Sequence, residues 1–171
     1  MIKLYLLKDK PEYIDKVADI NFNTWIDFYK DNQYEDITNI EEYKEYLRDN
    51  CKLIDKFPIN IIMINEKEDS EYIGSVSLLD DDFPEIARDK IWITELFVDP
   101  NYRNKGAGKL LIQAALDIAK IYGLQEVYLS CLEDLVFYYK KIGFQYTGEK
   151  ILFTNKKYYI FKYIFNNIKQ V

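Results

Sequence analysis

The sequence of 171 residues contains no histidine. This absence excludes catalysis in which histidine activates a serine or cysteine, metal sites built on imidazole, and histidine as a general base. Any proton that the protein removes from a substrate must therefore be taken by another group, and carboxylates are the leading candidates.

Cysteine is scarce, and long hydrophobic runs are missing. Cys51 and Cys131 lie far apart and have no metal-binding spacing, so we expect two free thiols in a reducing cytosol. The longest apolar runs, such as 61–64, fall far below the ~18 residues that span a bilayer. The N-terminal run 4–7 is too short for the core of a signal peptide. We therefore expect a cytoplasmic protein with no membrane partner.

Positive charge does not predominate either. The chain has 23 Lys and Arg against 29 Asp and Glu, which gives a formal net charge of −6. Neither this total nor the spacing of the basic residues fits a nucleic-acid partner. An acidic surface favours cationic small molecules or basic peptide ends, although such a charge also serves solubility alone.

The length corresponds to one domain, predicted to span residues 1–171. Hydrophobic periodicity predicts helices that begin near residue 9, at about 40, after 108 and at 134, with strands between and around them. The predicted strands are 1–7, 59–65, 72–79, 91–98, 127–131, 144–153 and 157–165. This order predicts an α/β fold with one mixed sheet and helices on both faces.

Two local features accompany this assignment. Asp9 followed by Glu12 predicts a capping box at the start of the first helix. The acidic segment 80–85 has no regular period, and we expect a loop there.

The segment most indicative of chemistry is the predicted strand 91–98 followed by Arg103-x-x-Gly106-x-Gly108 and a long amphipathic helix. The first turn of a helix has unpaired N–H groups and a partial positive charge, and glycines let that backbone approach a phosphate. A mononucleotide P-loop fails because Leu110 follows Lys109, and a dinucleotide fingerprint fails because Leu111 replaces the third glycine. The third interpretation, a loop that binds the pyrophosphate of coenzyme A, remains.

Two motifs then resemble the GNAT superfamily of N-acetyltransferases. The first is Leu96-Phe97-Val98-Asp99-Pro100-x-Tyr102-Arg103-x-Lys105-Gly106-x-Gly108, and the second is Tyr139-x-Lys141-x-Gly143-Phe144. The resemblance implies a GNAT-like, mostly antiparallel sheet that splays between the strands 91–98 and 127–131. Acetyl-CoA would lie in that gap, with its pantetheine on the main chain of Leu96 and Val98. The pyrophosphate would be held by Arg103, Asn104, Lys105, Gly106, Ala107, Gly108 and Lys109.

The implied reaction is direct transfer of the acetyl group to a primary amine of a small cationic molecule or a peptide. An N–H of Phe97 or Val98 would stabilise the oxyanion, and Tyr139 would protonate the leaving thiolate. The alternative is a catalytically silent module that binds acyl-CoA and regulates. We expect a monomer or a homodimer.

Several site residues have a structural alternative. Tyr139 shares a helical stripe with Leu135, Tyr138 and Ile142, which is typical of core packing. Glu95 is the candidate general base, although it could instead bind substrate or pair with a lysine. A bulge in its strand would change the face to which Glu95 points.

The acceptor side carries weaker signals. Trp25 and Tyr29 could line an acceptor pocket or belong to the core, and the acidic residues Asp80, Asp81, Asp82 and Glu85 could attract an amine or be a solvated charge run. The chain departs from many relatives at Leu132, where they carry an asparagine that contacts the cofactor. We expect the nearby Cys131 to be a small buried hydrophobe.

Overall fold

The fold is given by a computed structural model that describes residues 1–31, 39–54, 56–67, 70–80, 84–87, 89–153 and 155–165. Within these ranges, seven strands form one sheet in the order β1-β2-β3-β4-β5-β7-β6. They are β1 (Ile2–Leu6), β2 (Ile59–Asn65), β3 (Glu71–Asp80), β4 (Ile91–Val98), β5 (Glu126–Leu132), β6 (Gln145–Phe153) and β7 (Lys156–Ile164). Neighbouring strands are antiparallel except for β4 and β5, which are parallel. The mixed α/β sheet predicted from the sequence is confirmed.

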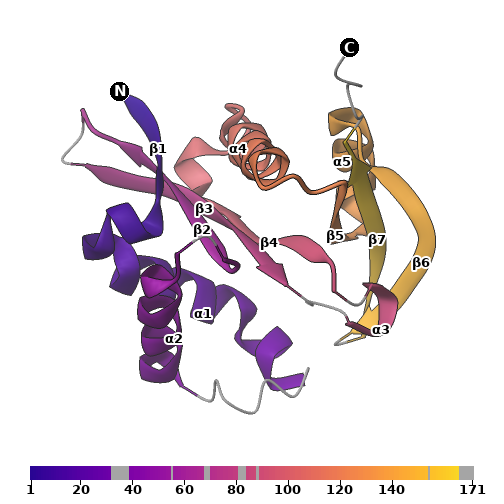
Figure 1. Cartoon of the computed structure of the whole chain (residues 1–171), viewed down its shortest axis with the longest axis horizontal. Helices are drawn as coiled ribbons and strands as arrows, with labels where there is room; N and C mark the ends of the chain where they lie inside the picture. Colours follow the sequence, from indigo (N-terminus) through magenta and orange to yellow (C-terminus); the bar gives the residue numbers. More distant parts are fainter. Residues whose placement is uncertain are drawn as a thin grey trace.

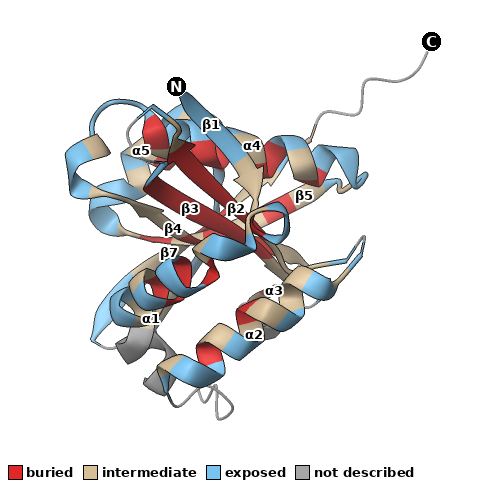
Figure 2. Cartoon of the chain, turned by 90° about the vertical axis from the view of Figure 1, so that its left-hand side faces the viewer, coloured by how far each residue is buried: buried red, intermediate tan, exposed pale blue. Residues whose placement is uncertain are grey.

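Helices cover both faces of this sheet (Figure 1). They are α1 (Ile14–Asp31), α2 (Ile40–Lys52), α3 (Pro84–Ala87), α4 (Ala107–Ile121) and α5 (Val136–Ile142). Strand side chains alternate between two hydrophobic layers. Ile61 and Met63 belong to the layer of α4, while Ile62 and Ile64 belong to the layer of α1 and α2. Figure 2 shows β2 and β3 as almost wholly buried between these layers.

Two expectations about local structure are corrected. Asp9 does not cap the first helix, because 3-10 turns at Leu7–Asp9 and Pro11–Tyr13 precede α1 and neither has a side-chain cap. A capping box occurs instead at α2, where Asn39 accepts from the N–H of Glu42 and the Glu42 carboxylate accepts from the N–H of Asn39.

The acidic segment also has more structure than a loop. β3 extends to Asp80, and Pro84–Ala87 forms one helical turn that begins at a proline, a residue favoured at the first helical position. Asp81 and Asp82 lie outside the described residues.

None of the helices within the described ranges combines the length and the apolarity that a bilayer crossing needs. The cysteines are free, with Cys131 buried and Cys51 half-buried, as expected.

The two adjacent leucines of α4 test the packing of this helix. Leu111 is fully buried against the sheet, whereas Leu110 is 52% exposed. We expect Leu111→Ala to lower the free energy of unfolding by about 2–5 kcal/mol, because it removes buried methyl groups and leaves a cavity. The control Leu110→Ala should change it by less than about 0.5 kcal/mol. Urea titration measures both, and similar losses for the two variants would contradict the orientation of α4.

Candidate functional site

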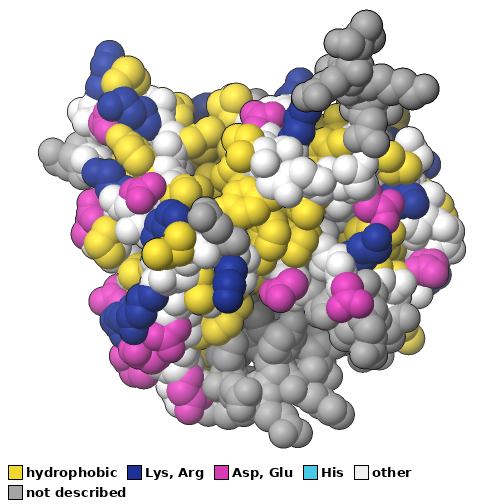
Figure 3. All heavy atoms as spheres, in the orientation of Figure 1, with side chains coloured by type: hydrophobic (Ala, Val, Ile, Leu, Met, Phe, Trp, Pro, Cys, Tyr) yellow, Lys and Arg dark blue, Asp and Glu magenta, His cyan; other side chains and the backbone are white. Residues whose placement is uncertain are grey.

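β4 separates from β5 along most of its length (Figure 1). In the described strands, the two pair at one register position, Trp92 opposite Tyr128. On its other edge, β4 stays paired with β3 as far as Val98, which lies opposite Gly74. The backbone of 96–98 therefore has a strand neighbour on one side only, as expected for a splayed sheet. Figure 3 shows hydrophobic side chains gathered in the centre of this face, between the half with β1–β4 and the half with β5–β7.

Close approach of β3 and β4 at this point depends on Gly74. A Cβ at residue 74 would lie 2.4 Å from the carbonyl oxygen of Phe97, well inside any allowed contact. Gly74 therefore fixes the last residues of β4 next to β3. The role of Gly74 is not evident from the sequence, because a glycine within a strand does not show which backbone approaches it.

The turn after β4 leads to the N-terminus of α4. Gly106 is the N-cap residue, with φ = +88° and no side-chain cap. The first intrahelical hydrogen bond is donated by the Leu110 N–H to the Gly106 oxygen at 3.1 Å. The N–H groups of Ala107, Gly108 and Lys109 precede it, so they are available to an anion outside the helix.

The two glycines of the motif have different roles. A Cβ at Gly106 would touch no protein atom within 4 Å, so within the protein itself it is the positive φ that favours glycine here. A Cβ at Gly108 would come within 3.3 Å of the Tyr138 hydroxyl, a tight contact, so the absence of a side chain at Gly108 allows α4 and α5 to pack closely.

The cationic side chains of the turn lie at the surface. Arg103, Lys105 and Lys109 are exposed, as is Asn104. The Nε of Arg103 donates to the carbonyl oxygen of Val98 at 2.9 Å, which ties the turn back to the end of β4.

Glu95 lies at a bulge in β4. Its φ is +52°, and the register between β3 and β4 shifts at this point. Beyond the bulge, Leu96 and Val98 pack in the layer of α4, whereas Phe97 packs in the layer of α1 and α2. The carboxylate of Glu95 also points toward α1 and α2, because its partners include Asn21 and Tyr43 from these helices. The bulge thus brings Glu95 to the face opposite α4.

A hydrogen-bond network surrounds this carboxylate, which is 7% exposed. Tyr43 donates to Oε1 at 2.5 Å, the Ser77 hydroxyl lies 2.7 Å from Oε2, and the Asn21 amide donates to Oε2 at 3.4 Å. The Ser77 hydroxyl also lies 2.7 Å from Oδ1 of Asn60. These partners are neutral side chains from α1, α2, β2 and β3.

Sequence reasoning missed the network although it left weak signals. Asn21 interrupts an otherwise apolar stripe, and Ser77 interrupts an apolar strand. The remaining members, Tyr43 and Asn60, could not be found from local pattern, because they come from two further elements, α2 and β2.

Tyr139 lies on α5 and is buried, with its ring against Tyr138 and Phe144. Burial, and secondarily the nearby Cys131, raises the pKa of Tyr139 above the ordinary tyrosine value, so its hydroxyl stays protonated at neutral pH. Its hydroxyl forms no hydrogen bond with the part of the chain that the structure describes.

Two residues at the end of β5, Cys131 and Leu132, have apolar side chains. Cys131 is buried, and desolvation raises the pKa of its thiol to about 12, so it behaves as a small apolar side chain. Leu132 is half-buried. This is the position at which the chain was found above to lack the asparagine of many relatives.

The remaining acceptor-side predictions are placed only in part. Trp25 is half-buried and packs in the layer of α1 and α2. Asp80 is exposed at the end of β3. The side chains of Tyr29 and Glu85 lie outside the described residues.

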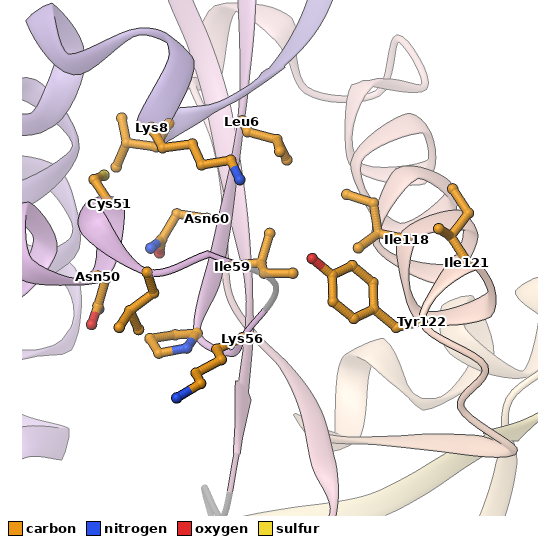
Figure 4. Close-up of a pocket in the computed structure, with 13 residues that line it drawn as sticks. Leu6, Lys8, Asn50, Cys51, Lys56, Ile59, Asn60, Ile118, Ile121 and Tyr122 are labelled. Atoms are coloured by element: carbon orange, nitrogen blue, oxygen red, sulfur yellow. The ribbon is translucent and has the colours of Figure 1, made fainter.

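A separate pocket of about 220 Å³ lies at the other end of the sheet (Figure 4). Ile118, Ile121 and Tyr122 from the C-terminal end of α4 line it, about 20 Å along the helix from Gly106. Leu6, Lys8, Cys51 and Asn60 line the opposite side. The pocket is therefore distinct from the splay, but it meets the Glu95 network at Asn60.

Comparison with known proteins agrees with this geometry. The family model described as "Acetyltransferase (GNAT) family" matches residues 17–144, more than half of the chain. The chain belongs to the GNAT acetyltransferase family. Members of this family use acetyl-CoA.

Curated GNAT relatives are similar over part of the chain. Spermine/spermidine N(1)-acetyltransferase of Bacillus subtilis (strain 168) is 33% identical over an alignment of 75 positions, which covers 39% of this chain and 49% of that protein. Glucosamine 6-phosphate N-acetyltransferase of Trypanosoma brucei brucei is 35% identical over 74 residues, 43% of this chain and 50% of that protein. The chain spans about half the length of the curated relatives it matches.

Solved structures show the same fold. Spermidine N-acetyltransferase from Vibrio cholerae, in complex with CoA and spermine, has a TM-score of 0.71 at 18% identity and covers 95% of both chains. A GNAT acetyltransferase from Streptococcus pneumoniae has a TM-score of 0.67 at 17% identity, over 96% of this chain and 99% of that one.

The conformation of Gly106 can be tested by its substitution. We expect Gly106→Ala to lower the free energy of unfolding by about 1–2 kcal/mol, because L-residues are disfavoured at positive φ. Gly106→Asn should cost less, since asparagine tolerates this region better. Urea titration of both variants measures the difference, and equal losses would mean that the strain does not come from φ.

Proposed function

We propose that this chain transfers an acetyl group from acetyl-CoA to a primary amine of a small cationic molecule. One observation carries the proposal. The backbone of β4 at 96–98 lacks a strand neighbour on the side of β5, close to the N-terminus of α4, and the residue just before it, Glu95, places a buried carboxylate on the face of α1 and α2. Acetyl-CoA, the acetyl donor, could therefore reach β4 from the side of β5, and the acceptor amine could reach it from the face of α1 and α2.

The residues present fit acetyl-CoA. The N–H groups of Ala107, Gly108 and Lys109 would bind the diphosphate, with Arg103, Asn104 and Lys105 around it. The splayed edge at Leu96, Phe97 and Val98 would pair with the pantetheine in the manner of an added strand. Acetyl-CoA supplies the acetyl thioester.

On the acceptor side, Glu95 would take a proton from the ammonium group, which must be neutral to attack. The amine nitrogen then bonds to the acetyl carbon, and the carbon–sulfur bond breaks. An N–H of Phe97 or Val98 would donate to the oxygen that becomes negative. Tyr139 would give its hydroxyl proton to the departing sulfur, and its raised pKa keeps that proton available at neutral pH.

The surroundings of Glu95 support a cationic acceptor. Besides the carboxylate, the buried Oδ1 of Asn21 accepts no hydrogen bond from the described residues, so an ammonium group would give it a donor. The similarity to the spermine/spermidine enzyme of Bacillus subtilis makes spermidine the first acceptor to test. We propose that residues 1–171 act as one cytoplasmic domain without a nucleic-acid partner, as a monomer or a homodimer.

Replacement of Glu95 tests the reaction. With spermidine as acceptor, we expect Glu95→Gln to lower kcat by at least about 100-fold, because the isosteric amide cannot take a proton. The KM for acetyl-CoA should stay nearly unchanged. Both kcat and the KM for acetyl-CoA are measured by following CoA release with a thiol reagent. The control is Glu149→Gln, at an exposed position. Saturable acetyl-CoA binding without thiol release across a panel of amines would instead indicate a silent regulatory module.

A second variant tests the proposed acid. Tyr139→Phe keeps the ring and its packing, so we expect kcat to fall by about 100-fold while acetyl-CoA affinity and unfolding free energy are retained. Tyr146→Phe, at a residue 37% exposed, serves as the control. Single-turnover kinetics measures the rate of acetyl transfer, and calorimetry measures the affinity for acetyl-CoA. Wild-type turnover in Tyr139→Phe would make Tyr139 a packing residue.

A further inference from the structure

The hydroxyl of Ser77 has one hydrogen and two acceptors. Its Oγ lies 2.7 Å from Oε2 of Glu95 and 2.7 Å from Oδ1 of Asn60. All three residues are at least nine-tenths buried. Since a serine hydroxyl donates only one hydrogen bond, it cannot satisfy both oxygens at once.

Two arrangements resolve this conflict. When Glu95 is ionised, Ser77 donates to Oε2, and the Asn60 amide must turn by 180° so that its NH₂ donates to Ser77 Oγ. When Glu95 is protonated on Oε2, Glu95 donates to Ser77 Oγ, and Ser77 donates to Oδ1 of Asn60. In each arrangement the Ser77 hydroxyl donates once and accepts once, so Ser77 Oγ, Oε2 of Glu95 and the Asn60 amide atom that faces Ser77 all have a partner.

The surroundings of Asn60 leave room for this rotation. Asn60 lines the pocket of about 220 Å³ at the end of the sheet, and Figure 4 shows its amide on the side of Asn50 and Cys51. The network also leaves the orientation of Glu95 fixed, because Tyr43 holds the other carboxylate oxygen in both arrangements.

We propose that Ser77 and Asn60 form a hydrogen-bond relay that couples the protonation of Glu95 to the orientation of the Asn60 amide. Ser77 is a positioning residue: it stabilises the carboxylate before the reaction and the carboxylic acid after it. In the transfer step the N–H bond of the ammonium group breaks and an O–H bond forms on Oε2, after which the hydrogen bonds of Ser77 and Asn60 reverse. The coupling to catalysis rests on the proposed function, whereas the relay itself does not.

The side-chain NH₂ signals of Asn60 report this reversal directly. In ¹⁵N-labelled protein, with the signals assigned by their loss in Asn60→Leu, we expect one pH-dependent step as Glu95 gains a proton. The step should persist in Ser77→Thr, which retains the hydroxyl. It should be lost in Ser77→Ala and in Glu95→Gln. Ser77→Ala should also move the acid limb of the kcat/KM profile toward higher pH by about one unit, because the carboxylate loses a donor.

The outcomes separate the two proposals. No step in the wild type, or a step that survives in Ser77→Ala, overturns the relay whatever the activity of Glu95→Gln. If the step follows the expected pattern while Glu95→Gln turns over at the wild-type rate, the relay stands and the role of Glu95 as base is wrong.

Discussion

The bulge at Glu95 determines the geometry of both sides of the site. A strand that kept its alternation from Ile93 would direct residue 95 toward α4, because Ile93 packs in that layer. The positive φ of Glu95 instead directs the carboxylate toward α1 and α2. A bulge also bends its strand and increases the local twist, which accords with the loss of pairing between β4 and β5 beyond Trp92.

Positive φ at a residue other than glycine is costly, so the surrounding structure must maintain it. Three features do so here. β3 holds the end of β4 from one side, where Gly74 admits the Phe97 carbonyl. Tyr43 and Ser77 hold the two carboxylate oxygens. Local backbone strain and side-chain hydrogen bonding are therefore linked at the residue that is proposed to accept the proton.

The sequence was sufficient for features that depend on neighbouring residues. Apolar periodicity predicted α4, and a glycine at 106 permits the left-handed N-cap that the structure shows there. The order of strands and helices, with the two motifs, predicted the splayed sheet. Local pattern was insufficient at Asp9, where a capping signal was overridden by the 3-10 turns around Pro11. It also could not reveal the Glu95 network, since Asn21, Tyr43 and Ser77 meet only after α1, α2 and β3 have packed around β4.

The central claim is that β4 contacts both acetyl-CoA and the acceptor amine, each from a different side of the strand. A crystal structure of the chain with CoA and spermidine tests it most directly. The account predicts the diphosphate on the N–H groups at the start of α4, the pantetheine beside Leu96–Val98, and an amino group of spermidine joined to Glu95 directly or through one water. A diphosphate bound elsewhere, or a spermidine on the α4 side of β4, would contradict it.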